Sequence, residues 1–174
     1  DARGDHDHRQ VAQAGVGAPG WSWAATWADV DGDGYQDLYV VRGRYPAGEP
    51  NLMYRNNHDG TFTEIGRETG LNDPNWGLGA AWADVDNDGD FDLVVTNHDN
   101  DIQLFENDGT GHFTDVSAGS GLDFGGFMLQ SKFADFDNDG FVDILIAGGV
   151  EYYFKNDGDG TFTPTVRHLQ PLST

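Results

Sequence analysis

The sequence contains no cysteine and few basic residues. The absence of cysteine excludes disulfides and thiolate metal sites, and it fits either a reducing or an oxidising compartment. Nine lysines and arginines stand against thirty aspartates and glutamates, which gives a formal net charge of −21. A chain with this charge repels nucleic acid phosphates and anionic membranes, so we expect no nucleic acid among its partners.

Long apolar runs are also missing. No stretch approaches the roughly 18 apolar residues that a membrane span requires, so we expect no membrane insertion. No apolar signal-peptide core lies at the start, where residues 1–9 are expected to form a flexible acidic tail. The sequence does contain 25 glycines and 13% aromatic residues, a composition that suits many short strands joined by tight turns.

One unit occurs three times along the 174 residues. Its most regular part is WADVDGDGYQDLYV, WADVDNDGDFDLVV and FADFDNDGFVDILI, beginning at residues 27, 82 and 133. A downstream part shares an asparagine, a turn glycine and a closing phenylalanine, and reads YRNNHDGTF, FENDGTGHF and FKNDGDGTF. Self-similarity of this kind predicts a repeat architecture.

Each unit is expected to form four short strands. Residues 21–28 alternate large with small side chains, and a face of small residues lets other backbone approach closely. DLYVV, DLVVT and DILIA are continuous apolar runs, typical of strands buried on both faces. We therefore predict an all-β fold of three four-stranded antiparallel propeller-type blades, within a repeat domain at 10–174. The expected blades cover about residues 21–66, 76–117 and 127–166.

Aspartates recur at loop positions 1, 3, 5 and 9 of each unit, with glycine at position 6. They are Asp29, Asp31, Asp33 and Asp37, then Asp84, Asp86, Asp88 and Asp92, then Asp135, Asp137, Asp139 and Asp143. Such a set matches a hard cation with about six to eight oxygen ligands, and calcium fits better than zinc or magnesium. The expected backbone ligands at position 7 are the carbonyls of Tyr35, Asp90 and Phe141. In the alternative interpretation, Asp and Gly only mark turns. Three copies in the same register favour three structural calcium sites instead.

These motifs resemble the FG-GAP and VCBS repeats, which form the blades of integrin-α-like propellers. The DxDxDGxxD loops and NDGxGxF turns carry the resemblance over about residues 10–166. The segment FTEIGRETGLNDPNWGLGAAWADVDNDGDFDLVVTN is further similar to the repeats that precede ASPIC/UnbV domains in secreted proteins. The resemblance implies that calcium is structural, that the twelve loop aspartates are ligands, and that no catalytic position is present. Members of the family include adhesion receptors, lectin-like proteins and accessory domains of polysaccharide enzymes.

The number of units departs from the family, because three units cannot close a ring of the family's size. Residues 8–16 (HRQVAQAGV) match residues 63–71 (TEIGRETGL), as the end of a preceding unit would. Either the chain is cut from a longer array, or protomers cover one another's open edges in a ring or a fibre.

Candidate catalytic and ligand-binding groups are few. The sequence holds no GxSxG, HExxH or phosphate-binding glycine loop, and metal-bound acids are poor general acids. His58 and His98 are candidate bases, although turn histidines without a catalytic role are the commoner case. Trp21, Trp76 and Phe127 share one repeated position, where they either stack on sugars or pack between blades, and packing is favoured.

We therefore expect a secreted, non-enzymatic, calcium-stabilised repeat module for adhesion or extracellular assembly. Its partner would be a second copy or an extracellular protein or glycan. Secretion follows from calcium, because extracellular modules bind this ion at roughly 10⁻⁴ to 10⁻³ M. Two alternatives stay open, a carbohydrate-binding lectin and an accessory region of a secreted polysaccharide-active enzyme.

Overall fold

The computed structural model describes residues 11–43, 49–98, 102–122, 128–148 and 151–166. The expected tail at residues 1–9 and the candidate Phe127 lie outside these ranges. No helix in the described ranges is long and apolar enough to cross a membrane.

Three four-stranded antiparallel sheets make up the fold, and in each the strands pair in the order of the chain. Sheet 1 contains β1 (Ser22–Ala28), β2 (Asp37–Arg42), β3 (Leu52–Asn56) and β4 (Phe62–Glu64). After the short helix α2 (Gly66–Thr69), sheet 2 contains β5 (Gly77–Ala83), β6 (Asp92–Asn97), β7 (Gln103–Asn107) and β8 (Phe113–Asp115). Sheet 3 contains β9 (Met128–Ala134), β10 (Asp143–Gly148), β11 (Tyr152–Asn156) and β12 (Phe162–Val166). The prediction of an all-β fold with three four-stranded antiparallel blades is confirmed.

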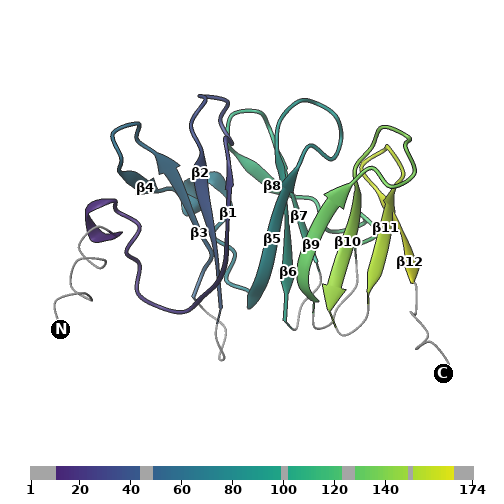
Figure 1. Cartoon of the computed structure of the whole chain (residues 1–174), viewed down its shortest axis with the longest axis horizontal. Coiled ribbons are helices and arrows are strands. Elements are labelled where there is room, and N and C mark those ends of the chain that lie inside the picture. The colour runs from purple at the N-terminus through teal and green to yellow at the C-terminus, as the bar shows by residue number, and fades with distance from the viewer. Residues whose placement is uncertain (1–10, 44–48, 99–101, 123–127, 149–150, 167–174) are drawn as a thin grey trace, which may run out of the picture.

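The sheets stand side by side in an open row, with the first strand of each next to that of its neighbour (Figure 1). Small side chains allow this approach: a Cβ atom on Gly79 of β5 would lie 2.5 Å from the carbonyl oxygen of Leu129 in β9. The row ends at sheets 1 and 3 without closing into a ring (Figure 1).

Two hydrophobic cores fill the spaces between the sheets. The β6 strand serves both, because Leu93 and Val95 face sheet 1 whereas Val94 faces sheet 3, and all three are buried. The apolar run DLVVT is thus buried on both faces, as its composition predicts. Sheet 1 contributes Tyr39, Val41 and Met53 to the first core, and sheet 3 contributes Ile144, Ile146 and Phe154 to the second.

Connecting segments cross from the end of one sheet onto the outer strand of the next. The amide of Phe162 in β12 donates to the carbonyl of Ser120 at 2.7 Å, and the amide of Phe62 in β4 donates to the carbonyl of Ala14 at 2.8 Å. Residues 11–16 therefore lie against the outer strand of sheet 1. The segment that connects sheet 2 to sheet 3 lies against the outer strand of sheet 3 in the same way. This placement agrees with the sequence match between residues 8–16 and 63–71.

Candidate metal centres

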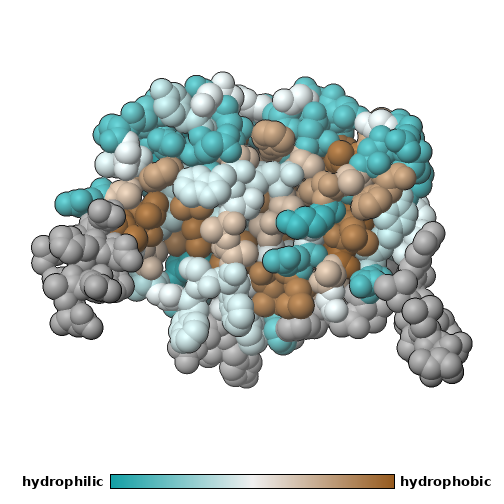
Figure 2. Space-filling model, in the orientation of Figure 1, coloured by the Kyte–Doolittle hydropathy of each residue, from teal (hydrophilic) through white to brown (hydrophobic). Residues whose placement is uncertain are grey.

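The three acid loops join the first two strands of each sheet and lie along one edge of the row, the upper edge in Figure 1. Figure 2 shows hydrophilic side chains along this edge, above apolar side chains in the middle of the same face. Loops 2 and 3 are neighbours, because the side-chain amide of Asn87 in loop 2 donates to the carbonyl of Gly140 in loop 3 at 3.0 Å.

Two left-handed residues give each loop its tight path. Position 6 is glycine, and Gly34, Gly89 and Gly140 have φ angles of 88°, 103° and 96°. Position 4 is also left-handed, at Gly32, Asn87 and Asn138. Gly and Asn are the residues that adopt this conformation most readily. The sequence interpretation used only the glycine at position 6. The glycine or asparagine at position 4 of each loop also indicated a left-handed residue.

The position-1 acid holds the loop closed. The Oδ1 atom of Asp29 accepts from the amide of Asp33 at 3.0 Å, and its Oδ2 atom accepts from the amide of Gly34 at 2.8 Å. Asp135 accepts from the amides of Asp139 and Gly140 in the same way. These bonds point the carboxylates toward the inside of the loop.

The position-9 acid is buried and joins two parts of its sheet. Asp92 accepts from the amide of Val85 in its own loop at 2.9 Å and from the amide of Asn107, the last residue of β7, at 3.0 Å. Asp37 and Asp143 make the equivalent pairs of bonds and are also buried. This acid therefore supports the fold as well as offering an oxygen to a cation.

Carboxylate oxygens converge in all three loops. In each loop, three acids offer oxygens that lie within 4.8 Å of one another: Asp29, Asp31 and Asp33, then Asp84, Asp86 and Asp92, then Asp135, Asp137 and Asp143. The sequence named four acids per loop, and the geometry leaves Asp37, Asp88 and Asp139 outside these clusters. The three clusters could each hold a metal ion.

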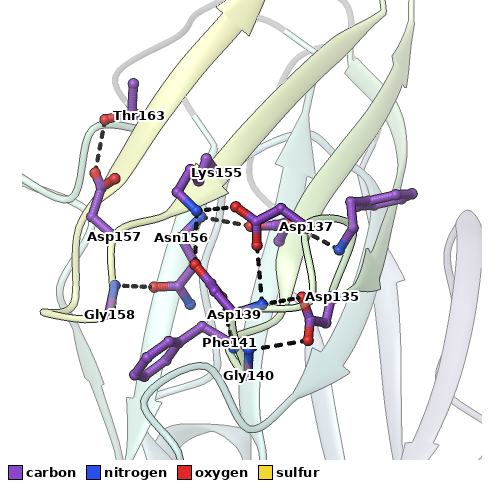
Figure 3. Close-up of polar contacts among 12 residues, drawn as sticks. Asp135, Asp137, Asp139, Gly140, Phe141, Lys155, Asn156, Asp157, Gly158 and Thr163 are labelled. Carbon is purple, nitrogen blue, oxygen red and sulfur yellow. Dashed lines mark hydrogen bonds and ion pairs between the residues drawn. The ribbon is translucent and has the colours of Figure 1, made fainter.

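Loops 1 and 3 each have a basic side chain beside their acids. Lys155 of β11 contacts both Asp137 and Asp139, with 2.7 Å between its Nζ atom and the Oδ2 atom of Asp139 (Figure 3). These hydrogen bonds raise the pKa of Lys155. In loop 1 the Nε2 atom of His58 lies 2.6 Å from the Oδ2 atom of Asp33. The repeat places Glu106 of β7 where sheet 3 has Lys155, so loop 2 has an acid at this position.

Three acids of loop 2, Asp86, Asp90 and Asp92, have raised pKa values. Burial raises the pKa of Asp92 to about 7, and the charges of Asp86 and Asp90 add to the rise. Burial and neighbouring acids raise the pKa of Asp90 to about 6. Burial is the largest cause of these shifts because it disfavours the charged form, and the neighbouring negative charges disfavour that form further.

Buried carboxylate oxygens without a hydrogen-bond partner show that loops 1 and 2 fit a hard cation. Within the described ranges, the Oδ1 atoms of Asp31, Asp84 and Asp90 are buried and accept no hydrogen bond. Leaving such an oxygen unpaired costs free energy, which a bound cation would recover. The donor set consists of oxygen atoms alone, which suits calcium better than zinc.

The position-7 residues were predicted to supply backbone carbonyls to the cation. Their side chains lie against the turn between the third and fourth strands of the same sheet. Tyr35 stacks on His58 with ring centroids 3.8 Å apart. Phe141 lies against Gly158, where an added Cβ would be 2.8 Å from the ring. Asp90 brings a further carboxylate to loop 2, a contribution that the sequence interpretation did not include.

The three aromatic residues of the repeated position have different surroundings. Trp76 stacks on His98 with ring centroids 4.1 Å apart, and it packs so closely on Gly43 that a Cβ there would lie 2.7 Å from its ring. Trp21 in sheet 1 is 60% exposed. Phe127 lies outside the described residues. Trp76 is therefore packed against neighbouring residues, as the packing interpretation predicts, whereas the ring of Trp21 is accessible to solvent.

Asparagines at the ends of β7 and β11 link loops 1 and 2 to the sheet that follows each of them. The Nδ2 atom of Asn107 donates to the carbonyl of Val30 in loop 1 at 3.0 Å and to the carbonyl of Phe91 at 3.2 Å. Asn156 likewise donates to Val85 in loop 2 at 2.8 Å and to Val142 at 3.1 Å. The repeated asparagine is visible in the sequence, but its partner in another sheet is not.

Comparisons with known proteins agree with this architecture. Cartilage acidic protein 1 of Xenopus tropicalis is 33% identical over 105 residues, and that of Homo sapiens is 32% identical over 105 residues. Each match covers 55% of this chain and 15% of the relative, so the chain spans a small part of these proteins. The model of the FG-GAP-like repeat matches at residues 2–40, 41–95 and 84–146. The chain therefore belongs to the FG-GAP-like repeat family.

Proposed function

We propose that this chain is a non-enzymatic module of the extracellular space that binds three structural calcium ions and acts in adhesion or assembly. The observation that carries the proposal is the recurrence of a three-carboxylate cluster in the same loop of all three sheets. A single acidic turn is common on protein surfaces, whereas a cluster in the corresponding loop of every sheet, always including the acids at positions 1 and 3, indicates a shared role. The unpaired buried oxygens in loops 1 and 2 support a cation in that role.

Calcium and the relatives both favour an extracellular location. Calcium modules outside cells bind the ion at roughly 10⁻⁴ to 10⁻³ M, which matches the millimolar calcium found there. The relatives carry the name cartilage acidic protein 1, which associates them with cartilage. The strongly acidic composition of this chain fits the same description.

The surroundings of the candidate bases support a role without catalysis. His58 lies between the ring of Tyr35 and the carboxylate of Asp33 at the rim of loop 1. His98 is stacked on Trp76. The loop acids accept hydrogen bonds from loop amides or converge on a cation position, which leaves them poorly placed as general acids.

A lectin is the second candidate, because two tryptophans of sheet 1 are accessible. Trp21 and Trp23 are 60% and 55% exposed, and exposed indole rings can stack on sugars. The Nε1 atom of Trp23 donates to the carbonyl of Gly43 at 2.6 Å, which fixes the orientation of this ring.

An adhesion assay on the 174-residue chain tests the proposed function. We expect cells to adhere to a surface coated with the calcium-loaded chain and to detach after chelation, and we expect Trp21→Ala to adhere as the unchanged chain does. A glycan array in the same buffers tests the lectin, whose hits should be lost with Trp21→Ala and retained with Asp115→Asn. Adhesion no greater than to albumin would contradict the adhesive role, and turnover of a polysaccharide would contradict the absence of catalysis.

A further inference from the structure

The free face of sheet 3 repeats surfaces that are covered elsewhere in the molecule. Phe136, Leu145 and Tyr153 line a hollow with a volume of about 470 Å³ on this face. Phe136 is 51% exposed and Leu145 is 40% exposed. The residues at the same repeat positions are covered by the following sheet and are buried: Val30, Tyr39 and Met53 in sheet 1, and Val85, Val94 and Leu104 in sheet 2. The hollow is thus the counterpart of two filled interfaces.

The free face of sheet 1 carries the group that fills such an interface. In sheet 2, Trp82 packs on Phe113 with ring centroids 5.8 Å apart and meets Tyr39 of sheet 1 edge-on at 6.0 Å. In sheet 1, Trp27 packs on Phe62 at 5.9 Å, which is the same pair in the same arrangement. Trp27 is 51% exposed because no sheet precedes it in the described structure.

The same face of sheet 1 also carries the side-chain amide of Asn56, which lacks the inter-sheet hydrogen bond made by its counterparts within the described ranges. Asn107 and Asn156 each donate to two carbonyls, one in their own sheet and one in the loop of the preceding sheet. Asn56 makes the bond within its own sheet, to the carbonyl of Gln36 at 3.1 Å, and makes no second one within the described ranges. The carbonyl that corresponds to those of Val30 and Val85 belongs to Phe136, on the free face of sheet 3.

The connector on sheet 1 leaves this face ready for a partner. Residues 11–16 already occupy the place that the end of a preceding sheet takes against the outer strand. A docking sheet therefore needs to supply only a face like that of sheet 3. The chain itself possesses such a face.

We propose that a second copy of this chain docks head to tail, with sheet 1 of one copy on sheet 3 of the other. Trp27 enters the hollow beside Leu145, and the side-chain amide of Asn56 donates to the carbonyl of Phe136. This contact continues the two interfaces within the chain and uses different faces of the two copies, so it is heterologous. It buries the apolar side chains that both ends now expose.

The docking is coupled to calcium, and in this respect it rests on the proposed function. Phe136 lies between Asp135 and Asp137, two acids of the loop 3 cluster. A cation in this loop would fix the backbone that presents the Phe136 carbonyl. It would also reduce the repulsion between two chains that each carry a formal net charge of −21.

Two variants that each disable one face test the arrangement. Trp27→Glu disables the face of sheet 1, and Leu145→Glu disables the face of sheet 3. Both side chains are exposed, and circular dichroism together with calcium calorimetry checks that each variant folds and binds the ion. In sedimentation velocity with calcium, we expect the unchanged chain to associate with rising concentration and each variant alone to remain a 19.0 kDa monomer. An equimolar mixture should form a one-to-one dimer, because each variant retains the face that the other lacks.

A milder variant and calcium calorimetry complete the test. Asn56→Ala should weaken association by about tenfold through loss of one buried hydrogen bond. The proposal is overturned if the calcium-bound unchanged chain stays monomeric, if either charged variant alone still dimerises, or if their mixture does not combine. Association of a chain that binds no calcium would support the docking of sheet 1 on sheet 3 but contradict both the proposed calcium sites and their coupling to docking, so the two failures are distinguishable.

Discussion

Removal of calcium should lower the melting temperature of this chain by about 10–25 °C. An ion present at about 10–100 times its Kd stabilises the folded state by about 1.4–2.7 kcal/mol per site, and three sites act together. For a domain of this size, 1 kcal/mol shifts the melting temperature by about 2–4 °C. Differential scanning calorimetry in about 10 mM calcium, which is about 10–100 times the expected Kd, and in excess chelator measures the change. Equal melting temperatures in the two buffers would contradict the role of calcium.

A pair of variants separates ion binding from the loss of charge. Asp86→Asn removes one oxygen ligand from the loop 2 cluster and should reduce the calcium-dependent shift by about a third, the contribution of one site among three. Glu68→Gln removes the same charge from the exposed surface of α2 and should leave the shift unchanged. A similar loss in both variants would point to net charge as the cause.

Asn107→Ala should destabilise the calcium-loaded fold by about 2–4 kcal/mol. The substitution leaves the carbonyls of Val30 and Phe91 without this donor, and it leaves the amides of Gly109 and Gly111 without this acceptor. Each buried group that loses its partner costs about 1–3 kcal/mol, and partial hydration of the turn reduces the sum. Urea unfolding at low protein concentration measures the loss.

Asn56→Ala is the matched control for this prediction. Asn56 occupies the same repeat position and bonds to Gln36 within its sheet, but in a single chain it makes no bond to a preceding sheet within the described ranges. Loss of the Asn56 side chain should lower the free energy of unfolding by about 1 kcal/mol. Equal effects of the two substitutions would show that the bond between sheets contributes nothing to stability.

The strands and loops could be predicted because the information that sets them is local and repeated. A continuous apolar run such as DLVVT specifies a strand with two buried faces, and the structure buries Leu93 and Val94 on opposite sides. The aspartates of each loop lie within nine residues of one another, so their spacing alone predicts that they converge. Trp21 and Trp76 share one repeat position, and both lie in the described structure. Trp76 is packed against its neighbours, whereas Trp21 is 60% exposed.

The contacts that the sequence did not predict join distant parts of the chain. Asn107 and Val30 are separated by 77 positions, and only the packing of sheet 2 on sheet 1 brings them together. Lys155 approaches Asp137 across 18 positions because β11 runs beside loop 3 in the folded sheet. The repeat made the asparagines recognisable as equivalent, but it could not reveal that Asn107 and Asn156 are bonded to the loop of the preceding sheet.

The number of calcium ions bound per chain tests the account most directly. Isothermal titration calorimetry of the chelator-treated chain should give three ions per unchanged chain and two for Asp86→Asn, with Glu68→Gln as the control that keeps three. Absence of binding at millimolar calcium, or a stoichiometry that Asp86→Asn leaves unchanged, would contradict the assignment of the acid loops as calcium sites.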